Sequence, residues 1–107
     1  MLGKLQKDFE RASVRYAETT GILRDDDWFI LKLVEEMGEV TQAWNRLSGR
    51  ARRKGLDEET LRTALEDETA DLLGHVLLFA HRHGLDLDAA VERKWRFSPV
   101  GTDGTAP

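Results

Sequence analysis

Hydrophobic residues recur along most of the chain at steps of three and four, the spacing that places side chains on one face of an α-helix. The first such stretch predicts a helix over residues 3–19, which Gly21 ends. Its apolar or small positions are Leu2, Leu5, Phe9, Ala12 and Tyr16. A second helix is predicted to start after the acidic run 25–27, whose carboxylates can accept hydrogen bonds from unpaired N–H groups, and to continue to about residue 47.

The second predicted helix stops at Ser48 and Gly49, and a basic loop over residues 50–55 follows it. Asp57 can cap a third helix, which runs to about Gly84 and should be the most buried element of the fold. Its broad apolar surface comprises Leu61, Leu65, Ala70, Leu72, Leu73, Val76, Leu77, Phe79 and Ala80.

A short fourth helix is predicted to begin at Asp86 or Asp88 and to end before Pro99. No segment alternates with a period of two residues for long enough to form a strand. We therefore predict an all-α fold, a four-helix bundle-like single domain over residues 1–98, followed by a disordered tail over 99–107.

Composition narrows the class of protein further. The chain has 107 residues, of which 40% are hydrophobic and 34% charged, enough for one compact domain. The absence of cysteine excludes a disulfide scaffold, a thiolate zinc site and a cysteine nucleophile. No apolar run approaches the roughly 20 residues that span a bilayer, and the first residues lack the apolar core of a secretory signal. We expect a soluble, cytoplasmic protein without a membrane partner, and the net charge of −4 argues against a nucleic-acid polymer as a partner.

Two acidic motifs interrupt the apolar pattern. Glu35, Glu36 and Glu39 lie within an apolar stretch of the second predicted helix, about 40° to 60° apart around its axis, so the three can point to one side. Glu68 and Asp71 lie three residues apart on the third, directly before its most hydrophobic run. If the two helices pack together, four or five carboxylates converge in a partly desolvated cleft and repel one another unless a cation lies among them. Ligand sets of oxygen alone favour Mg²⁺ or Mn²⁺ over zinc.

Each motif taken alone also fits a solvated helix face. Lys32, three residues before Glu35, can pair with that carboxylate as an ordinary surface salt bridge. The occurrence of both motifs on neighbouring helices, each beside apolar residues, favours the metal site.

The segments Leu33–Val40 and Glu68–Leu73 resemble the E-E-x-x-E and E-x-x-D signature of the all-α nucleoside triphosphate pyrophosphohydrolases, the MazG-like superfamily. The resemblance covers roughly residues 28–95 and includes a closing segment, 84–94, that ends in Lys94. It implies a MazG-type domain that assembles through helix packing between subunits. It also implies Mg²⁺-dependent cleavage of a nucleoside triphosphate between the α- and β-phosphates, which yields the monophosphate and pyrophosphate.

The resemblance assigns roles residue by residue. Glu36, Glu39, Glu68 and Asp71 would bind the metal, and Glu35 would be a further ligand or would orient the attacking water. The chemistry agrees with these roles, because phosphoryl transfer depends mainly on positioning and on neutralising charge at the phosphate oxygens.

A triphosphate carries more negative charge than the metal neutralises, so basic residues should line the rest of the site. The resemblance places Lys94 there, and Lys32 and Arg46 are candidates from their position alone. The basic residues of the loop are also candidates: Arg50, Arg52, Arg53 and Lys54. This loop can close over phosphate or serve as a mobile connection.

Aromatic residues offer stacking surfaces for a base. Trp44 is one candidate, as are Trp28 and Trp95, although tryptophan at helical spacing also fits a core or a subunit interface. Asn45 can read the edge of a base, and His75, four residues after Asp71, can support a metal ligand or occupy the core.

Two other interpretations stay open. Residues 32–36 and 68–75 also resemble phosphoribosyl-ATP pyrophosphohydrolase of the same superfamily, but the upstream serine-tyrosine-threonine segment is missing and the gap between the motifs is long. The second interpretation is a non-catalytic helical metal-binding or interaction module. The complete set of five carboxylates argues against it. Glu-x-x-His pairs are absent, which disfavours a di-iron site.

The apolar run 72–80 would leave a large exposed patch on a monomer, so we predict a homodimer at least, and the resemblance implies dimers or tetramers. Without the five motif carboxylates the chain has 15 acidic and 16 basic residues, which makes its acidity local. A phosphate-rich ligand that arrives with Mg²⁺ is compatible with such a surface.

Overall fold

The computed structural model describes residues 1–100, which form four α-helices and no strand. The helices are α1 (Leu2–Thr20), α2 (Asp26–Leu47), α3 (Glu58–Arg82) and α4 (Leu87–Trp95). The all-α prediction is therefore confirmed for this part of the chain. None of these helices is both long and apolar enough to cross a membrane. The predicted disordered tail falls, from residue 101 on, outside the described residues.

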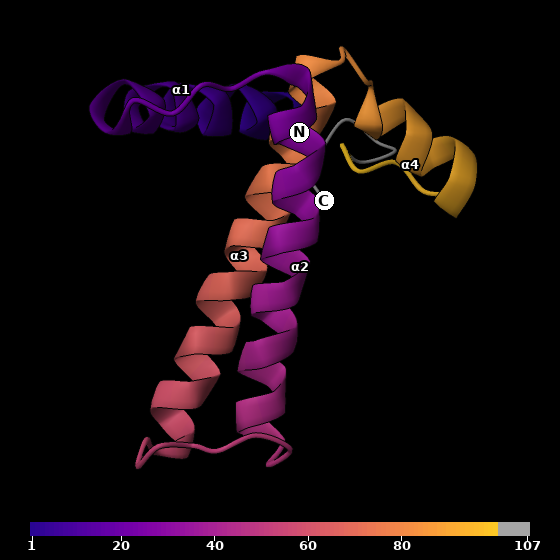
Figure 1. Cartoon of the computed structure of the whole chain (residues 1–107). Coiled ribbons are helices and arrows are strands. Elements are labelled where there is room, and N and C mark those ends of the chain that lie inside the picture. Colours follow the sequence, from indigo (N-terminus) through magenta and orange to yellow (C-terminus); the bar gives the residue numbers. More distant parts are fainter. Residues whose placement is uncertain (101–107) are drawn as a thin grey trace.

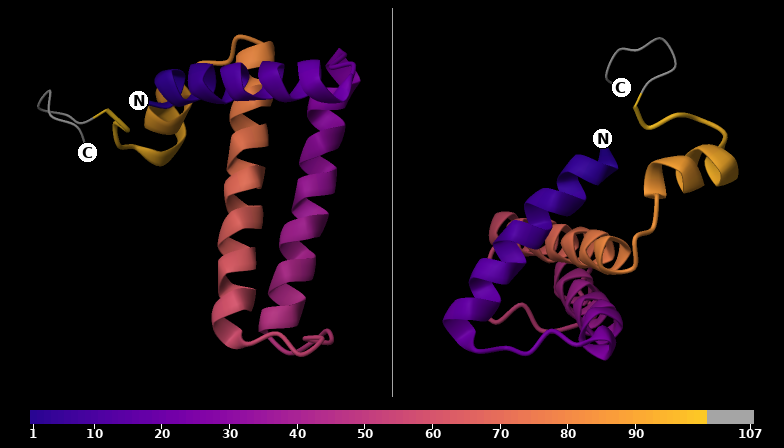
Figure 2. Two further views of the ribbon diagram at one scale, coloured as in Figure 1. Left: turned by 90° about the vertical axis from the view of Figure 1, so that its left-hand side faces the viewer. Right: turned by 90° about the horizontal axis from the view of Figure 1, so that it is seen from above.

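The helices α2 and α3 lie side by side as an antiparallel hairpin, joined at its far end by the basic loop (Figure 1). Helix α1 crosses the opposite end of this hairpin at a steep angle, and α4 projects away from it (Figure 2). The resulting shape is extended and flat, with dimensions of 47 × 37 × 20 Å. The two acidic motifs lie on the two helices of the hairpin, which pack against each other along their length.

Aspartate side chains start three of the helices, as the sequence predicts. Each accepts a hydrogen bond from a backbone N–H of the first turn, the usual role of an N-cap. The pairs are Asp25 with Trp28, Asp57 with Thr60, and Asp86 with Ala89. Asp88 has a different role, because it accepts a hydrogen bond of 3.2 Å from the backbone N–H of Leu2 and thereby joins α4 to the start of α1.

Helix α3 contributes four of the six buried hydrophobic residues, in agreement with its predicted central place. The buried hydrophobic residues are Phe29, Ala43, Leu61, Leu77, Leu78 and Ala80. Not all of the predicted apolar surface is covered, however, because Leu73 is 50% exposed and Val76 is 39% exposed. A single chain therefore buries only part of the apolar surface of its hairpin.

Two contacts fix α1 on the hairpin. Gly74 of α3 lets the ring of Phe9 approach so closely that a Cβ atom at position 74 would lie 2.7 Å from it. From the segment between α1 and α2, the guanidinium of Arg24 donates hydrogen bonds of 2.9 and 2.8 Å to the two carboxylate oxygens of Glu10, the residue after Phe9. Arg24 also lies over the ring of Phe29, at 5.2 Å from its centroid. The angle at which α1 crosses the hairpin is set by these packing and charge contacts.

Candidate metal centre and adjoining pocket

Three glutamates converge where the middle of α2 faces α3. Glu36 and Glu39 lie one turn apart on α2, and Glu68 lies opposite them on α3. Each offers one carboxylate oxygen, and the three oxygens lie within 4.8 Å of one another. We refer to these three residues as the glutamate cluster. The packing of two helices has brought together carboxylates that are about 30 residues apart in the sequence.

The glutamate cluster contains polar atoms that the protein itself does not satisfy. Glu36 is only 5% exposed. Among residues 1–100, Oε2 of Glu36 and Oε2 of Glu68 are buried without a hydrogen-bond partner. Buried polar atoms in proteins almost always have partners, so two such oxygens in one cluster need a partner that the described residues do not supply, such as a proton, a water or a cation. A hard divalent cation fits this donor set, because it prefers carboxylate oxygens and supplies the missing positive charge.

The environment of the cluster opposes negative charge. Burial, together with the neighbouring charge of Glu39, raises the pKa of Glu36. The hydrogen bond to Glu39 raises the pKa of Glu68, and burial and the surrounding carboxylates add to this effect. Like charges held close together in a partly desolvated place therefore favour a shared proton or a bound cation.

Lys32 is the basic residue that reaches the cluster. Its Nζ lies 3.4 Å from Oε1 of Glu36 and 3.3 Å from Oε2 of Glu35. Nε2 of His75 also lies 3.7 Å from Oε1 of Glu36. Burial and the charge of Lys32 lower the pKa of His75, so its imidazole is neutral near pH 7 and contributes no positive charge. One ammonium group thus faces three clustered carboxylates.

The other two motif carboxylates lie at the edge of this site. The Glu35 side chain is 58% exposed and pairs with Lys32. Asp71 is exposed on α3, one turn after Glu68, and its charge contributes to the raised pKa of Glu68. Of the five predicted residues, three therefore form the cluster and two flank it.

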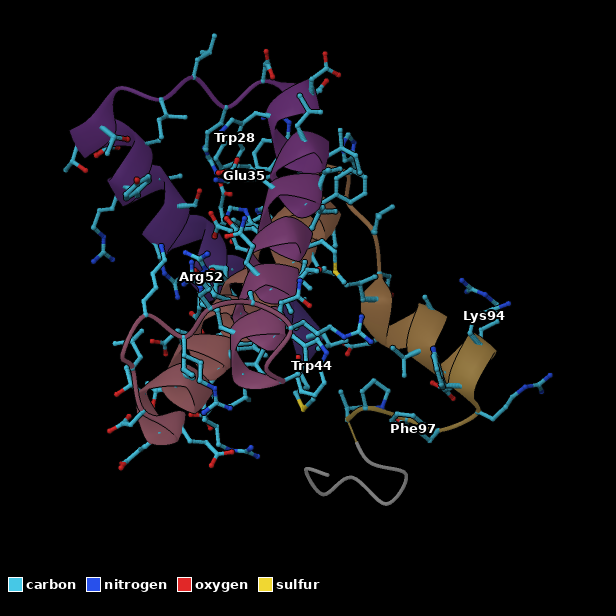
Figure 3. All side chains as sticks on the ribbon, turned by 60° about the horizontal axis from the view of Figure 1, so that its bottom comes forward. Trp28, Glu35, Trp44, Arg52, Lys94 and Phe97 are labelled. Carbon is cyan, nitrogen blue, oxygen red and sulfur yellow. The ribbon has the colours of Figure 1, made fainter. Side chains whose placement is uncertain are left out.

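A pocket of about 440 Å³ adjoins the cluster between α1 and the hairpin. Glu36 and Asp71 form part of its wall, so the pocket and the carboxylates share residues. The remaining wall includes aromatic or hydroxyl side chains from all three helices: Phe9, Ser13 and Tyr16 of α1, Trp28 of α2 and His75 of α3. Figure 3 shows Trp28 near the end of α2 that carries Glu35.

Several predicted substrate-binding residues lie elsewhere. Trp44, Asn45 and Arg46 are in the last turns of α2 and do not line the pocket. Lys94 is exposed on the projecting α4, which Figure 3 shows apart from the hairpin that carries Glu35. Within one chain, the structure brings none of these four residues to the pocket.

The basic loop lies at the end of the hairpin away from α1 (Figure 1). One of its arginines, Arg53, donates a hydrogen bond of 2.8 Å to the backbone carbonyl of Leu47, the last residue of α2. Arg53 therefore satisfies a helix terminus, and no contact in the described chain places it at the carboxylates.

Sequence reasoning missed the contribution of α1 to the site. The apolar spacing places Phe9 and Tyr16 on one face of a helix, but no local pattern shows which surface that face contacts. Gly74 was the available signal, since a glycine inside the apolar run of a long helix indicates close approach by another element.

Comparisons of the chain with models of protein families, with curated proteins and with solved structures found no match.

Proposed function

We propose that this protein is a Mg²⁺-dependent nucleotide pyrophosphohydrolase of the MazG-like type, which cleaves a nucleoside triphosphate between its α- and β-phosphates. The observation that carries this proposal is the glutamate cluster, in which three carboxylates from α2 and α3 approach within 4.8 Å and two buried oxygens have no partner. The order and spacing of the two motifs supply the reaction type through the resemblance to that superfamily.

A divalent cation held by Glu36, Glu39 and Glu68, with Asp71 beside them, would neutralise negative charge on the phosphate oxygens. Mg²⁺ is the proposed ion, and Mn²⁺ fits the same oxygen ligands. Lys32 lies between the cluster and the pocket and can bind a phosphate group when it releases Glu36.

Glu35 would orient the attacking water and accept its proton. Its side chain is 58% exposed, and its Oε2 lies 3.3 Å from Nζ of Lys32. The water oxygen forms a bond to the α-phosphorus, and the bond from that phosphorus to the bridging oxygen breaks. The water proton passes to the carboxylate, and the products are the nucleoside monophosphate and pyrophosphate.

The experiment is a pyrophosphate-release assay with Mg²⁺ or Mn²⁺ on a panel of triphosphates, both standard and modified at the base, with deoxynucleotides and phosphoribosyl-ATP included. We expect metal-dependent turnover of at least one member of the panel, and its identity separates the MazG-like activity from the phosphoribosyl-ATP alternative. Absence of turnover with either metal would leave only the non-catalytic metal-binding module.

We also propose that the protein works as a homodimer or homotetramer in the cytoplasm, where triphosphates and Mg²⁺ occur together. Its radius of gyration is 16.5 Å, whereas a compact domain of this length has about 13 Å. The hairpin exposes a set of large apolar side chains: Leu31, Val34, Met37, Trp44, Leu73 and Val76. Exposed apolar surface of this kind favours helix packing between subunits, and through it Lys94 of one chain can approach the site of another. A monomeric sedimentation profile at micromolar concentration would contradict this assembly.

A further inference from the structure

The pocket beside the glutamate cluster has a lining that the carboxylate chemistry does not require. Metal ligands need oxygen atoms, yet the pocket continues away from them along the rings of Phe9, Tyr16, Trp28 and His75. Its volume of about 440 Å³ falls in the range of pockets that enclose small organic ligands. The ligand must therefore have an apolar or aromatic part as well as a part that meets the carboxylates.

We propose that this pocket binds the planar base of the nucleotide, and that Trp28 and Tyr16, in place of Trp44, supply its stacking surfaces. This inference rests on the proposed function, because a base joined to a polyphosphate is the ligand that uses both halves of the site. The pocket shares Glu36 and Asp71 with the carboxylate site, so one molecule can occupy both. Trp44 lies on α2 outside this lining.

The ring of Trp28 is held in place before any ligand arrives. It makes edge-to-face contacts with Phe29, at 5.0 Å between centroids, and with His75, at 5.8 Å. A ring that is already ordered loses little conformational freedom when a base stacks on it. Tyr16 faces the same pocket from α1 and is 60% exposed, which leaves it accessible to a ligand.

Ser13 gives the pocket a polar group that can read the base. Its Oγ accepts a hydrogen bond of 3.1 Å from Arg24, so its own proton remains to be donated. Ser13 lines the pocket, and a carbonyl oxygen or an unprotonated ring nitrogen of a base is the matching acceptor. Gly74 preserves this wall, because it lets Phe9 and the rest of α1 approach α3 closely.

The test measures binding of uncharged nucleosides without metal, so that it does not depend on hydrolysis or on the glutamate cluster. Calorimetric titration of the full chain with adenosine, guanosine, cytidine and uridine, in the presence of a chelator, should show saturable binding of at least one. We expect Trp28→Leu and Tyr16→Leu to weaken that binding about tenfold or more, the usual cost of removing a stacking ring. Ala12→Phe, which fills the pocket from α1, should abolish it.

Two further variants control the experiment. Trp44→Leu tests the competing stacking site, and Phe97→Leu removes an aromatic side chain that is 56% exposed and outside the pocket. Both should bind the nucleoside as the parent protein does. Mn²⁺ binding by Ala12→Phe, measured by electron paramagnetic resonance, should be unchanged, which shows that the chain is folded and the cluster is intact.

The outcomes separate this inference from the proposed function. If no nucleoside binds to the parent protein, or if Trp44→Leu loses binding while the pocket variants keep it, the base pocket is wrong even where pyrophosphate is released. If nucleosides bind in the pocket but no triphosphate is hydrolysed, the base pocket stands and the enzymatic function is wrong.

Discussion

Among residues 1–100, the junction of α1 with the hairpin and the glutamate cluster both shield glutamate side chains partly from water, and they are built in opposite ways. At the junction of α1 with the hairpin, both oxygens of Glu10 accept hydrogen bonds from Arg24. This hydrogen bonding, opposed in part by burial, lowers the pKa of Glu10. Each charge at the junction is matched by a charge of opposite sign, as expected for a contact that holds two elements together.

The glutamate cluster has the contrary arrangement. Glu36, Glu39 and Glu68 share one lysine at most, and the pKa of Glu36 and of Glu68 is raised instead of lowered. A fold that pairs Glu10 with arginine leaves Oε2 of Glu36 and Oε2 of Glu68 without a partner. Mutual repulsion and burial at the cluster therefore oppose folding of the metal-free chain, and such a cost is typical of groups kept for binding or catalysis.

Glu39→Gln should reduce hydrolysis by about 100-fold or more, because the amide keeps the shape of the side chain but removes a charged ligand. Asp71→Asn should also abolish activity. The assay is Mg²⁺-dependent pyrophosphate release, with helix content checked by circular dichroism. Glu66→Gln, an exposed position two residues before Glu68, is the matched control and should keep full activity. Unchanged activity of either site variant would remove that residue from the metal site.

Arg24→Met should lower the free energy of unfolding by about 2 kcal/mol, because Glu10 keeps its charge in a partly buried place and loses both hydrogen bonds. Urea denaturation measures the change. Arg11→Met breaks a mostly exposed pair with Asp8 and should cost less than about 0.5 kcal/mol. Equal losses in the two variants would show that the junction is an ordinary surface ion pair.

Glu68→Gln should raise the free energy of unfolding by about 1 kcal/mol in the presence of a chelator, since it removes one of three mutually repelling charges. Glu10→Gln, the same chemical change at the junction, should lower the free energy of unfolding. Denaturation of both variants and of the parent protein in one buffer measures the two changes and their signs. If Glu68→Gln destabilises the metal-free protein as Glu10→Gln does, the two environments are alike and the comparison fails.

The smallest expected effect is the pH dependence of these differences. Because folding lowers the pKa of Glu10, the stabilisation from its carboxylate is fully present above the ordinary pKa of 4.5 and is lost as the pH falls through the lower folded-state pKa. Because folding raises the pKa of Glu68, the destabilisation from its carboxylate is fully present above the folded-state pKa and disappears as the pH falls towards 4.5.

Denaturation of the parent protein, Glu10→Gln and Glu68→Gln from about pH 3 to pH 8 without metal checks this prediction. The loss of unfolding free energy in Glu10→Gln should be constant above its ordinary pKa of 4.5 and shrink below it, whereas the gain in Glu68→Gln should grow as the pH rises above 4.5. Saturating Mg²⁺ should reverse the sign of the Glu68→Gln difference, because the ion then requires that charge. A Glu68→Gln difference that does not vary with pH would contradict the raised pKa.

Much of the fold could be predicted from local patterns. The apolar spacing located all four helices, and the aspartates before α2, α3 and α4 indicated their starts. Asp57 was identified as a cap, while the structure chose Asp25 from the run 25–27 and Asp86 over Asp88. The motif spacing also indicated which faces of α2 and α3 carry carboxylates. These properties depend on residues three or four apart, and a sequence shows such separations directly.

The site was less predictable where it depends on distant elements. Trp44 and Asn45 are predicted to contact a base because of their side-chain types, and Arg46 is predicted to contact phosphate from its position. The structure places all three in the last turns of α2, outside the pocket lining. The position of Lys94 relative to the cluster depends on the direction of α4, which no spacing within the motifs determines (Figure 2).

Local periodicity and hydrogen bonding specify the helices, the aspartate caps and the two sets of carboxylates, and they also place Lys32 beside Glu35 and Glu36 on one helix. Which surfaces pack together is not visible in any local pattern, and that packing brings Glu36, Glu39 and Glu68 together and lets α1 close a pocket beside them. The cluster follows from the packing of α2 against α3, and the pocket follows from the approach of Phe9 to Gly74 and from the hydrogen bonds between Arg24 and Glu10. Contacts of that kind join residues far apart in the chain, and packing alone selects among the surfaces on which an apolar helix face can come to lie.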